Sequence, residues 1–342
     1  MKYIYSLLVI LHLNVKLFSQ DTSSVYKYYQ LTNKAELAIV DNQPQKAAKF
    51  YKKAFSISNI KPFSTDLYNA SINLIDINKY RIAKKYLIYM VANGLDLKYI
   101  ENETAFVKIY SKKNWKKKIG KTNIIKKNKV LIDTLNLLEY RDQYFRKLPG
   151  SYKLYDDTIR KLDINNVSIL KKLIDEKGYP SEKKIGYYEG FSFSKNFEIV
   201  IWHQTASYKK VDFTTILRNA VTKGEIQPKR AAHLIENQQS EDIYLITRFF
   251  TVSCPTCTHD FQKKIQDKFF YFSLSNETIH NINKLRYQIK LESLQDQEKK
   301  NYFSINNPES KFIFYPGYIS KFSFQNETDA LGFINNLKFI GR

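Results

Sequence analysis

The stretch QPQKAAKFYKKAFSI, residues 43–57, has the spacing of a helix that buries small side chains. Ala47, Tyr51 and Ala54 stand at positions i, i+4 and i+7, so a helix places them on one face. The pattern predicts a helix that packs closely against a neighbour through its alanines.

The same pattern recurs in NKYRIAKKYLIYM, residues 78–90, where Ala83, Leu87 and Met90 have the same spacing. Each of these helices follows a segment that predicts a partner helix, namely VYKYYQLTNKAELAIV (25–40) and TDLYNASINLIDI (65–77, with Thr65-Asp66 as its expected cap). A helical unit repeated after about 34 residues is typical of stacked helix pairs. Residues 21–118 therefore resemble a short tetratricopeptide-like array of two pairs plus an extra helix. The consensus Gly and Trp of that repeat are missing, and an ordinary bundle of four or five helices is the alternative.

Composition indicates a folded protein with a strong excess of positive charge. A length of 342 residues suggests about two domains. Hydrophobic residues make up 43% of the chain, which is enough for folded cores. Lys and Arg number 55 against 33 Asp and Glu, a net charge of +22. This excess suits an anionic partner, for which an anionic envelope surface is the candidate, but lysines spread along the chain favour a compositional bias. Nucleic acid is not favoured as a partner, because regular aromatic interleaving is missing.

A basic segment separates the two predicted domains. SKKNWKKKIGKTNIIKKNK, residues 111–129, holds nine lysines. We expect a helix end followed by a solvated linker over 119–129, with an anion-binding strip as the alternative.

The N-terminus predicts export. Lys2 and an apolar run from Ile4 to Val15 have the features of a secretory signal peptide over residues 1–20. The run is shorter than the roughly 20 residues that span a bilayer, and no later segment is a transmembrane candidate. We therefore expect a periplasmic or secreted protein in an oxidising compartment.

The second domain, residues 130–300, is predicted to be helical with a small β-hairpin or sheet. VLIDTLNLLEYRDQYFRKL (130–148) predicts a helix with Leu131, Leu135, Leu138 and Phe145 on a buried stripe, and helical patterns continue to residue 239. IYLITRFFTVS (243–253) and KFFYFSLS (268–275) are rich in β-branched and aromatic residues and predict strands. Two more helices follow, and residues 301–342 predict an extension of short strands and a closing helix. The expected fold class is mainly α, with helical repeats followed by an α+β domain.

Short motifs in this second domain resemble the bacterial domain-of-unknown-function family 6624 between about residues 135 and 300. The motifs are EYRDQYFR with Arg141, Asp142, Gln143 and Arg146, then Asp163 with Asn166, Gly178-Tyr179-Pro180, Ile185-Gly186, His203 and Arg286. The chain departs from the family at Glu236-Asn237, where relatives have an Asp-Arg pair, and in IYLITRFF, where they have a polar turn. The resemblance implies a fold and no reaction.

Five residues are candidates for catalysis: His203, Asp142, Arg141, Arg146 and Arg286. An inward His203 beside Asp142 has the chemistry of a general base, and arginines bind anionic substrates through paired hydrogen bonds. The alternative is a buried polar network that ties helices together. Nucleotide-binding and protease motifs do not occur, and the sequence indicates no cofactor or metal.

CPTCTH, residues 254–259, contains both cysteines of the chain. A Cys254–Cys257 disulfide at the tip of a hairpin suits an exported protein. Three alternatives stay open, of which the simplest is a pair of free thiols. A thiol redox site is suggested by the preceding strand and following helix, and a zinc site by His259 with His280 or Asp260.

The sequence thus leads to three functional hypotheses. The first is a non-catalytic interaction or scaffold role, in which the helical repeats bind a protein partner. The second is a hydrolase-like enzyme that acts on an anionic or amide substrate through His203, Asp142 and the arginines. The third is thiol–disulfide chemistry at Cys254 and Cys257.

Overall fold

The computed structural model describes residues 24–112, 114–125, 127–192, 194–206, 210–314, 320–335 and 337–341. The predicted signal peptide lies outside these residues. The described chain is mainly α-helical with one four-stranded sheet, as the fold class predicted. It forms two compact units, divided between Ser240 and Glu241. None of the described helices combines the length and apolarity needed to cross a membrane.

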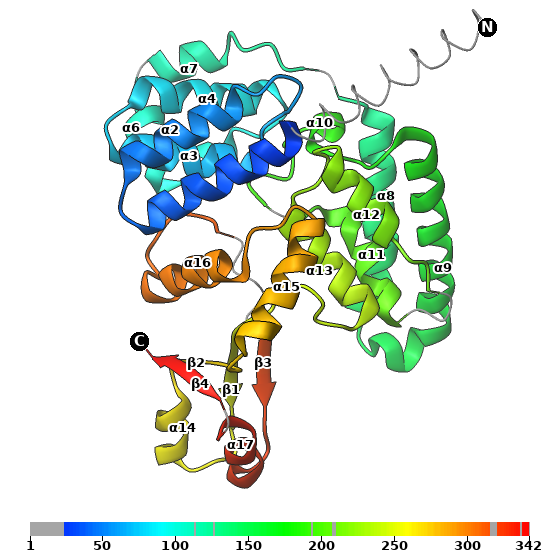
Figure 1. Cartoon of the computed structure of the whole chain (residues 1–342). Coiled ribbons are helices and arrows are strands. Elements are labelled where there is room, and N and C mark those ends of the chain that lie inside the picture. The colour runs from blue at the N-terminus through cyan, green and yellow to red at the C-terminus, as the bar shows by residue number, and fades with distance from the viewer. Residues whose placement is uncertain are drawn as a thin grey trace, which may run out of the picture. The chain divides into compact units, whose positions relative to one another are not determined.

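The first unit begins with four helices, of which Figure 1 shows α2, α3 and α4 lying side by side. They comprise residues 24–40, α2 (Pro44–Phe55), α3 (Ser64–Asp76) and α4 (Tyr80–Ala92). The periodic residues quoted above from α2 and α4 are all fully buried. The predicted helices and their buried faces are thus confirmed.

Helix α3 is enclosed on all sides, since every residue from Ser64 to Ile75 is buried. The predicted cap at Thr65-Asp66 is wrong, because the residue at the N-cap position is Phe63 and its side chain makes no capping bond. Instead, Glu182 accepts the Ser64 N–H at 2.9 Å and the Ser64 hydroxyl at 2.6 Å. A carboxylate from a distant segment therefore satisfies a donor at the helix start and favours the positive end of the helix.

Short helices follow α4 in place of the single extra helix that was predicted. They are α5 (Lys98–Glu101), η1 (Thr104–Phe106), α6 (Val107–Tyr110) and α7 (Asn114–Ile119). Trp115 of α7 is fully buried. The Ile125 N–H donates to the Ala92 carbonyl at 2.8 Å, so part of the segment expected as a linker bonds to the end of α4.

A long antiparallel helix pair forms the other side of the first unit (Figure 1). The elements of this region are α8 (Lys129–Lys147), α9 (Ser151–Lys177), α10 (Glu182–Ile185), η2 (Asn196–Glu198), α11 (Ile199–Trp202), η3 (His203–Ala206), α12 (Thr214–Thr222) and α13 (Pro228–Gln239). Gly178 ends α9 with a φ of 71°, a backbone conformation that glycine adopts without steric cost. The stripe on α8 is confirmed at its three leucines, whereas Phe145 is only half-buried.

Buried polar contacts join the first four helices to the rest of the first unit. The Tyr29 hydroxyl lies 3.0 Å from the carbonyl oxygens of Val221 and Ile226. Lys229 of α13 pairs with Glu36 at 3.1 Å. The boundary expected at 119–129 therefore lies inside one compact unit.

The second unit contains a mixed sheet with the order β3-β1-β2-β4. Its strands are β1 (Phe250–Ser253), β2 (Lys268–Tyr271), β3 (Ser320–Ser323) and β4 (Lys338–Gly341). β1 runs antiparallel to β2 and parallel to β3, and β2 runs antiparallel to β4. The helices are α14 (His259–Ile265), α15 (Asn276–Gln288), α16 (Leu294–Asn306) and α17 (Glu327–Ile334). β1 and β2 form the expected antiparallel pair, but α14 lies between them in the chain, so the tight hairpin that was predicted is not formed.

Two predictions for this unit need correction. Residues 243–249 are not part of a strand, because their backbone carbonyls accept side-chain donors: Tyr244 accepts from Arg286, and Ile246 accepts from Gln297. Residues 301–306, expected as extended chain, complete α16, and the closing helix α17 is followed by β4. In both places tertiary contacts outweigh the local β propensity of aromatic residues.

Candidate functional site

Helices α8 and α9 pack against each other and bury acidic residues at the positions where apolar residues would be expected. The buried residues of α8 are Leu131, Leu135, Leu138 and Asp142, which stand at i, i+4, i+7 and i+11. In α9, Asp163 and Asn166 lie in a buried stripe between Ile159 and Leu170. Because a buried charge is costly unless paired, these acids need partners close by.

Asp142 pairs with His203, the first residue of η3. His203 Nδ1 lies 2.9 Å from Asp142 Oδ1 and 2.8 Å from Oδ2. The carboxylate is 1% exposed and the imidazole 19% exposed, so the acid is enclosed and the ring reaches the surface. Gln143 Nε2 also donates to Asp142 Oδ2, at 2.8 Å. A carboxylate held at Nδ1 assigns the proton to that nitrogen and leaves Nε2 as the basic atom.

Arg146 links the two buried acids. One of its terminal nitrogens donates to both carboxylate oxygens of Asp163 at 2.8 Å. The other donates to the Asp142 carbonyl at 2.6 Å and lies 3.4 Å from Asp142 Oδ2. Burial raises the pKa of Asp163, and the hydrogen bond from Arg146 opposes that rise. Arg146 Nε donates to the Tyr152 hydroxyl at 2.9 Å, so the guanidinium is held on three sides.

The cluster also has the residue types of a metal site. Ligand atoms of Asp142, Asp163 and His203 lie within 4.8 Å of one another. However, the Arg146 guanidinium already contacts both carboxylates and supplies the positive charge that a cation would bring. His203 Nδ1 is engaged with Asp142 as well. This arrangement favours acid–base chemistry over metal binding.

Of the five predicted catalytic residues, the structure brings Asp142, His203 and Arg146 into contact. Arg141 is half-buried beside Asp142 in the sequence of α8. Arg286 belongs to the second unit and is fully buried there. It donates to the carbonyls of Glu292 and Tyr244 and to Gln297 Oε1, at 2.8, 2.5 and 2.8 Å. Its donors serve the local fold, which assigns it a structural role.

Asp163 belongs to the site, although the sequence predicted it only as part of a motif. Tyr152 and the contact of Gln143 with Asp142 were not predicted. The available signal was helical period, since Asp142 and Asp163 each occupy a position where the surrounding apolar spacing predicts burial. A polar residue at such a position predicts a buried partner.

A second histidine, His233, is separated from the site by the ring of Trp202. His233 of α13 packs against Trp202, the neighbour of His203, with ring centroids 4.7 Å apart. Burial, followed by the charge of Arg230, lowers the pKa of His233 to about 3. His233 is therefore neutral at physiological pH and contributes packing next to the site. Asn237 Nδ2 donates to the Trp202 carbonyl at 2.9 Å and holds the same turn.

The two cysteines form a disulfide, as predicted. Cys254 is buried in the core of the sheet and its helices, with Phe250, Val252, Phe261 and Ala330 among its neighbours. Because both sulfurs are bonded to each other, neither acts as a zinc ligand in this state. β2 returns antiparallel to β1, so the segment differs from the parallel βαβ unit in which redox C-x-x-C motifs are usually found.

Comparisons of the chain with protein families, curated proteins and solved structures found no match in any of the three.

Proposed function

We propose that the protein is a hydrolase-like enzyme in which His203 acts as general base and Asp142 positions it. The observation that carries this proposal is the Asp142–His203 pair, with a buried carboxylate at 2.8 Å from Nδ1 and a ring that remains partly exposed. A general base must lie within hydrogen-bond reach of the proton it takes, and a partly exposed imidazole reaches water and substrate.

The chemistry follows from the orientation of the ring. With the Nδ1 proton donated to Asp142, Nε2 takes a proton from a water molecule as the water oxygen attacks a carbonyl carbon. The proton then passes from Nε2 to the leaving amine or alcohol, so the base is regenerated. Asp142 stabilises the imidazolium formed between these two steps.

The proposed substrate class is an anionic or amide compound. Arg146 is fully engaged by Asp142, Asp163 and Tyr152, so it organises the site instead of binding substrate. Arg141 is then the candidate ligand for a substrate anion, because it precedes Asp142 on α8 and is only half-buried.

Membership of the domain-of-unknown-function family 6624 is part of this proposal. The positions of three motifs support this membership, because residues from all three contact one another in one cluster. EYRDQYFR supplies Asp142 and Arg146, the second motif supplies Asp163, and the third supplies His203.

The scaffold hypothesis has less support from the described contacts. Residues of α3 and the helix over 24–40, which a repeat array would offer to a partner, instead contact other segments of the first unit. Examples are Ser64 with Glu182 and Thr65 with Gln227. A concave face that the chain itself covers has little surface left for a protein partner.

The proposal is tested by assaying the full chain against a panel of chromogenic esters, anilides and phosphoesters. We expect His203→Gln to lower kcat/KM by about 10²- to 10⁴-fold, the usual contribution of a general base. Asp142→Asn should lower it as well, because the amide favours the wrong tautomer. The matched control is His280→Gln, at an exposed histidine of α15, which should retain wild-type activity. Retention of activity in a folded His203→Gln protein would refute the proposal, as would a wild-type protein that turns over no member of the panel.

A further inference from the structure

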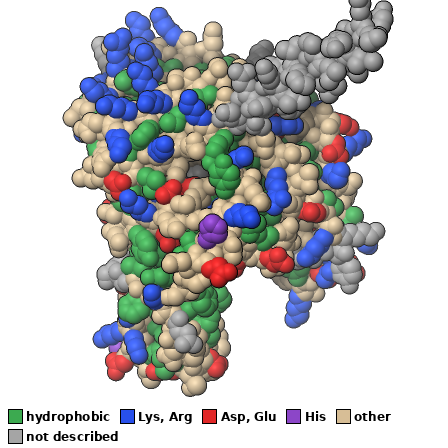
Figure 2. Space-filling view, viewed as in Figure 1, with side chains coloured by type: hydrophobic (Ala, Val, Ile, Leu, Met, Phe, Trp, Pro, Cys, Tyr) green, Lys and Arg blue, Asp and Glu red, His purple; other side chains and the backbone are tan. Residues whose placement is uncertain are grey.

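A second feature of the first unit, outside the candidate site, is a cluster of lysines on α4 and α7. The sequence contains no Asp or Glu from residue 77 to 95 or from 107 to 130. The fold brings these two stretches together. We define the α4–α7 basic surface as Lys79, Arg81, Lys84, Lys85, Lys112, Lys116, Lys117 and Lys118. Figure 2 shows Lys and Arg side chains gathered over α7 and the neighbouring helices at the upper left.

Aromatic contacts hold this surface together. Trp115 is fully buried, and the Lys84 ammonium lies 5.7 Å from the centre of its ring. Lys112 lies 5.2 Å from the centre of the Tyr80 ring, at the start of α4. The stretch predicted to be a helix end and solvated linker is thus anchored on α4 up to Ile119. The backbone that carries its lysines is thus held beside α4.

No ion pair neutralises these charges within the part of the chain that the structure describes. Lys84 is half-buried, and the other seven side chains are exposed. Burial lowers the pKa of Lys84, and the charges of Lys118 and Lys112 lower it further, as expected of lysines crowded together. Like charges held close together repel one another, and an anionic partner would relieve that repulsion.

The composition of the surface distinguishes between anionic partners. Seven of its eight charges are lysines, which act as mobile point charges and lack the planar fork of arginine for paired contacts. A surface hollow at the start of α4 is lined by Lys79, Arg81 and Lys85 together with Ile82, which is 41% exposed. Lysines around an exposed apolar residue suit a layer of headgroups over hydrocarbon, whereas single-stranded nucleic acid needs exposed aromatic rings for stacking.

We propose that the α4–α7 basic surface docks the protein on membranes that carry anionic phospholipids. The attraction is electrostatic and diffuse, and it increases with each lysine near the headgroups. It is independent of the His203 chemistry, since the two features involve different elements of the first unit.

The test is sedimentation of the full chain with phosphatidylcholine vesicles that contain about one third phosphatidylglycerol or none, at about 0.05 M salt. We expect binding to the anionic vesicles only, and loss of binding at about 0.5 M salt. Lys116→Gln/Lys117→Gln/Lys118→Gln should weaken binding about a hundredfold, since each lysine near a headgroup layer contributes about fivefold. Glutamine keeps helix propensity, so α7 should persist, as circular dichroism will show.

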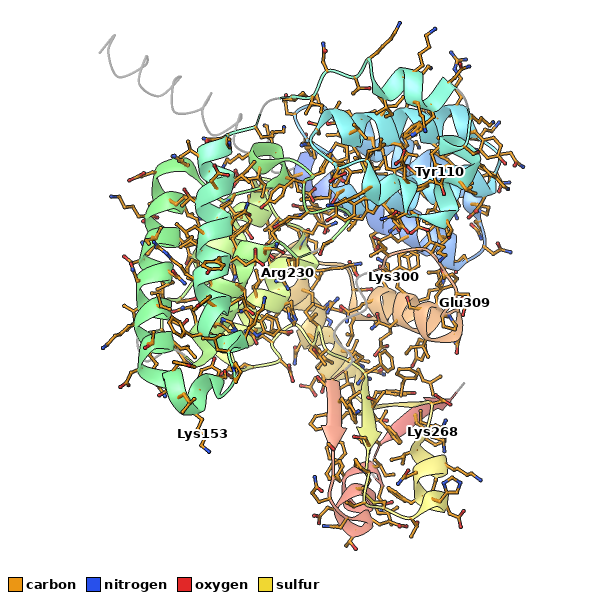
Figure 3. The ribbon with its side chains drawn as sticks, turned by 180° about the vertical axis from the view of Figure 1, so that it is seen from behind. Tyr110, Lys153, Arg230, Lys268, Lys300 and Glu309 are labelled. Atoms are coloured by element: carbon orange, nitrogen blue, oxygen red, sulfur yellow. A yellow bond between two sulfur atoms is a disulfide. The ribbon has the colours of Figure 1, made fainter. Side chains whose placement is uncertain are left out.

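The matched control is Lys147→Gln/Lys153→Gln/Lys161→Gln, which removes the same charge from exposed positions on α8 and α9. In Figure 3, Lys153 and Tyr110, the last residue of α6, lie at opposite ends of the first unit. The control should bind as tightly as wild type. Equal weakening of both variants would mean that only net charge matters and would overturn the proposal. Equal or tighter binding to a DNA oligonucleotide, or no binding to the anionic vesicles, would overturn it too.

Discussion

Asp142 shows how one residue organises a site. Its carboxylate accepts hydrogen bonds from His203 and Gln143 and lies beside the guanidinium of Arg146. It stands at a position where the spacing of α8 would otherwise place an apolar side chain. A buried ion pair adds little net stability relative to a well-packed apolar residue. In the proposed mechanism, the role of this acid is to position His203.

Asp66 is a second buried acid, and it predicts how stability depends on pH. Burial, followed by the charge of Glu36, raises the pKa of Asp66 to about 7, although the Tyr28 hydroxyl donates to it at 2.5 Å. The folded-state pKa thus exceeds the unfolded value, and the folded protein binds the additional proton. The contribution of Asp66 is therefore fully present in acid and is lost as the pH rises through about 7.

We expect Asp66→Asn to remove this loss, which amounts to about 4 kcal/mol in the free energy of unfolding between about pH 4 and pH 8. Urea denaturation of both proteins across that range measures the difference. Asp133→Asn, at an exposed acid on α8, is the control and should follow wild type. Parallel pH profiles for wild type and Asp66→Asn would contradict the assignment.

The local sequence predicted some of the residues in the candidate site correctly and others wrongly. His203, Asp142 and Arg146 were identified because they carry chemistry and occur in motifs. Arg286 has the same chemistry, but each of its three guanidinium nitrogens donates to a backbone or amide acceptor. Side-chain type indicates which reaction a residue supports, whereas only its partners decide whether the residue is available for that reaction.

Elements with strong periodicity were predicted well, and elements that depend on distant partners were not. Helices α2, α4 and α8 show their buried faces in the sequence. Helix α3 is buried all round although it carries Ser64, Asp66, Asn69 and other polar residues. Its burial depends on acceptors and donors from other segments, which a local pattern does not contain.

Arg286 connects α15 to two other segments of the second unit. The Arg286 guanidinium joins α15 to the backbone at Tyr244 and Glu292, in place of the strand that residues 243–249 were expected to form. We expect Arg286→Met to destabilise the protein by about 3 kcal/mol, since several buried acceptors lose their donor.

Arg286→Lys should restore little of the lost stability, because one ammonium group does not reach the three separate acceptors of the guanidinium. Chemical denaturation followed by circular dichroism measures both variants. Lys284→Met, on the exposed face of α15, serves as the control and should be nearly neutral. A stable Arg286→Met protein would show that these bonds contribute little.

At the level of the whole molecule, paired buried charges unite the first unit. Glu36 and Lys229 come from segments 193 residues apart and lie 3.1 Å from each other with little exposure. We expect Lys229→Met alone to cost about 3–5 kcal/mol, because it leaves Glu36 buried without its ammonium partner. The double variant Glu36→Gln/Lys229→Met should recover part of that loss.

A double-mutant cycle by urea denaturation measures the coupling between the two residues. The tryptophan signal reports on the first unit alone, since both tryptophans, Trp115 and Trp202, lie in it. Additive single effects would mean that the pair does not join the two segments.

The sequence by itself determined the helical class and the main helices with their buried faces, and it favoured the strands β1 and β2 and the disulfide. These features depend on residues that are close in the chain, where a period of 3.6 or 2 and a short C-x-x-C loop are directly visible. Tertiary structure alone decided three others: the single compact first unit, the meeting of Asp142, Asp163 and His203, and the joining of α4 to α7. The physical reason is that buried charges are stable only beside partners, and those partners come from segments that no local pattern connects.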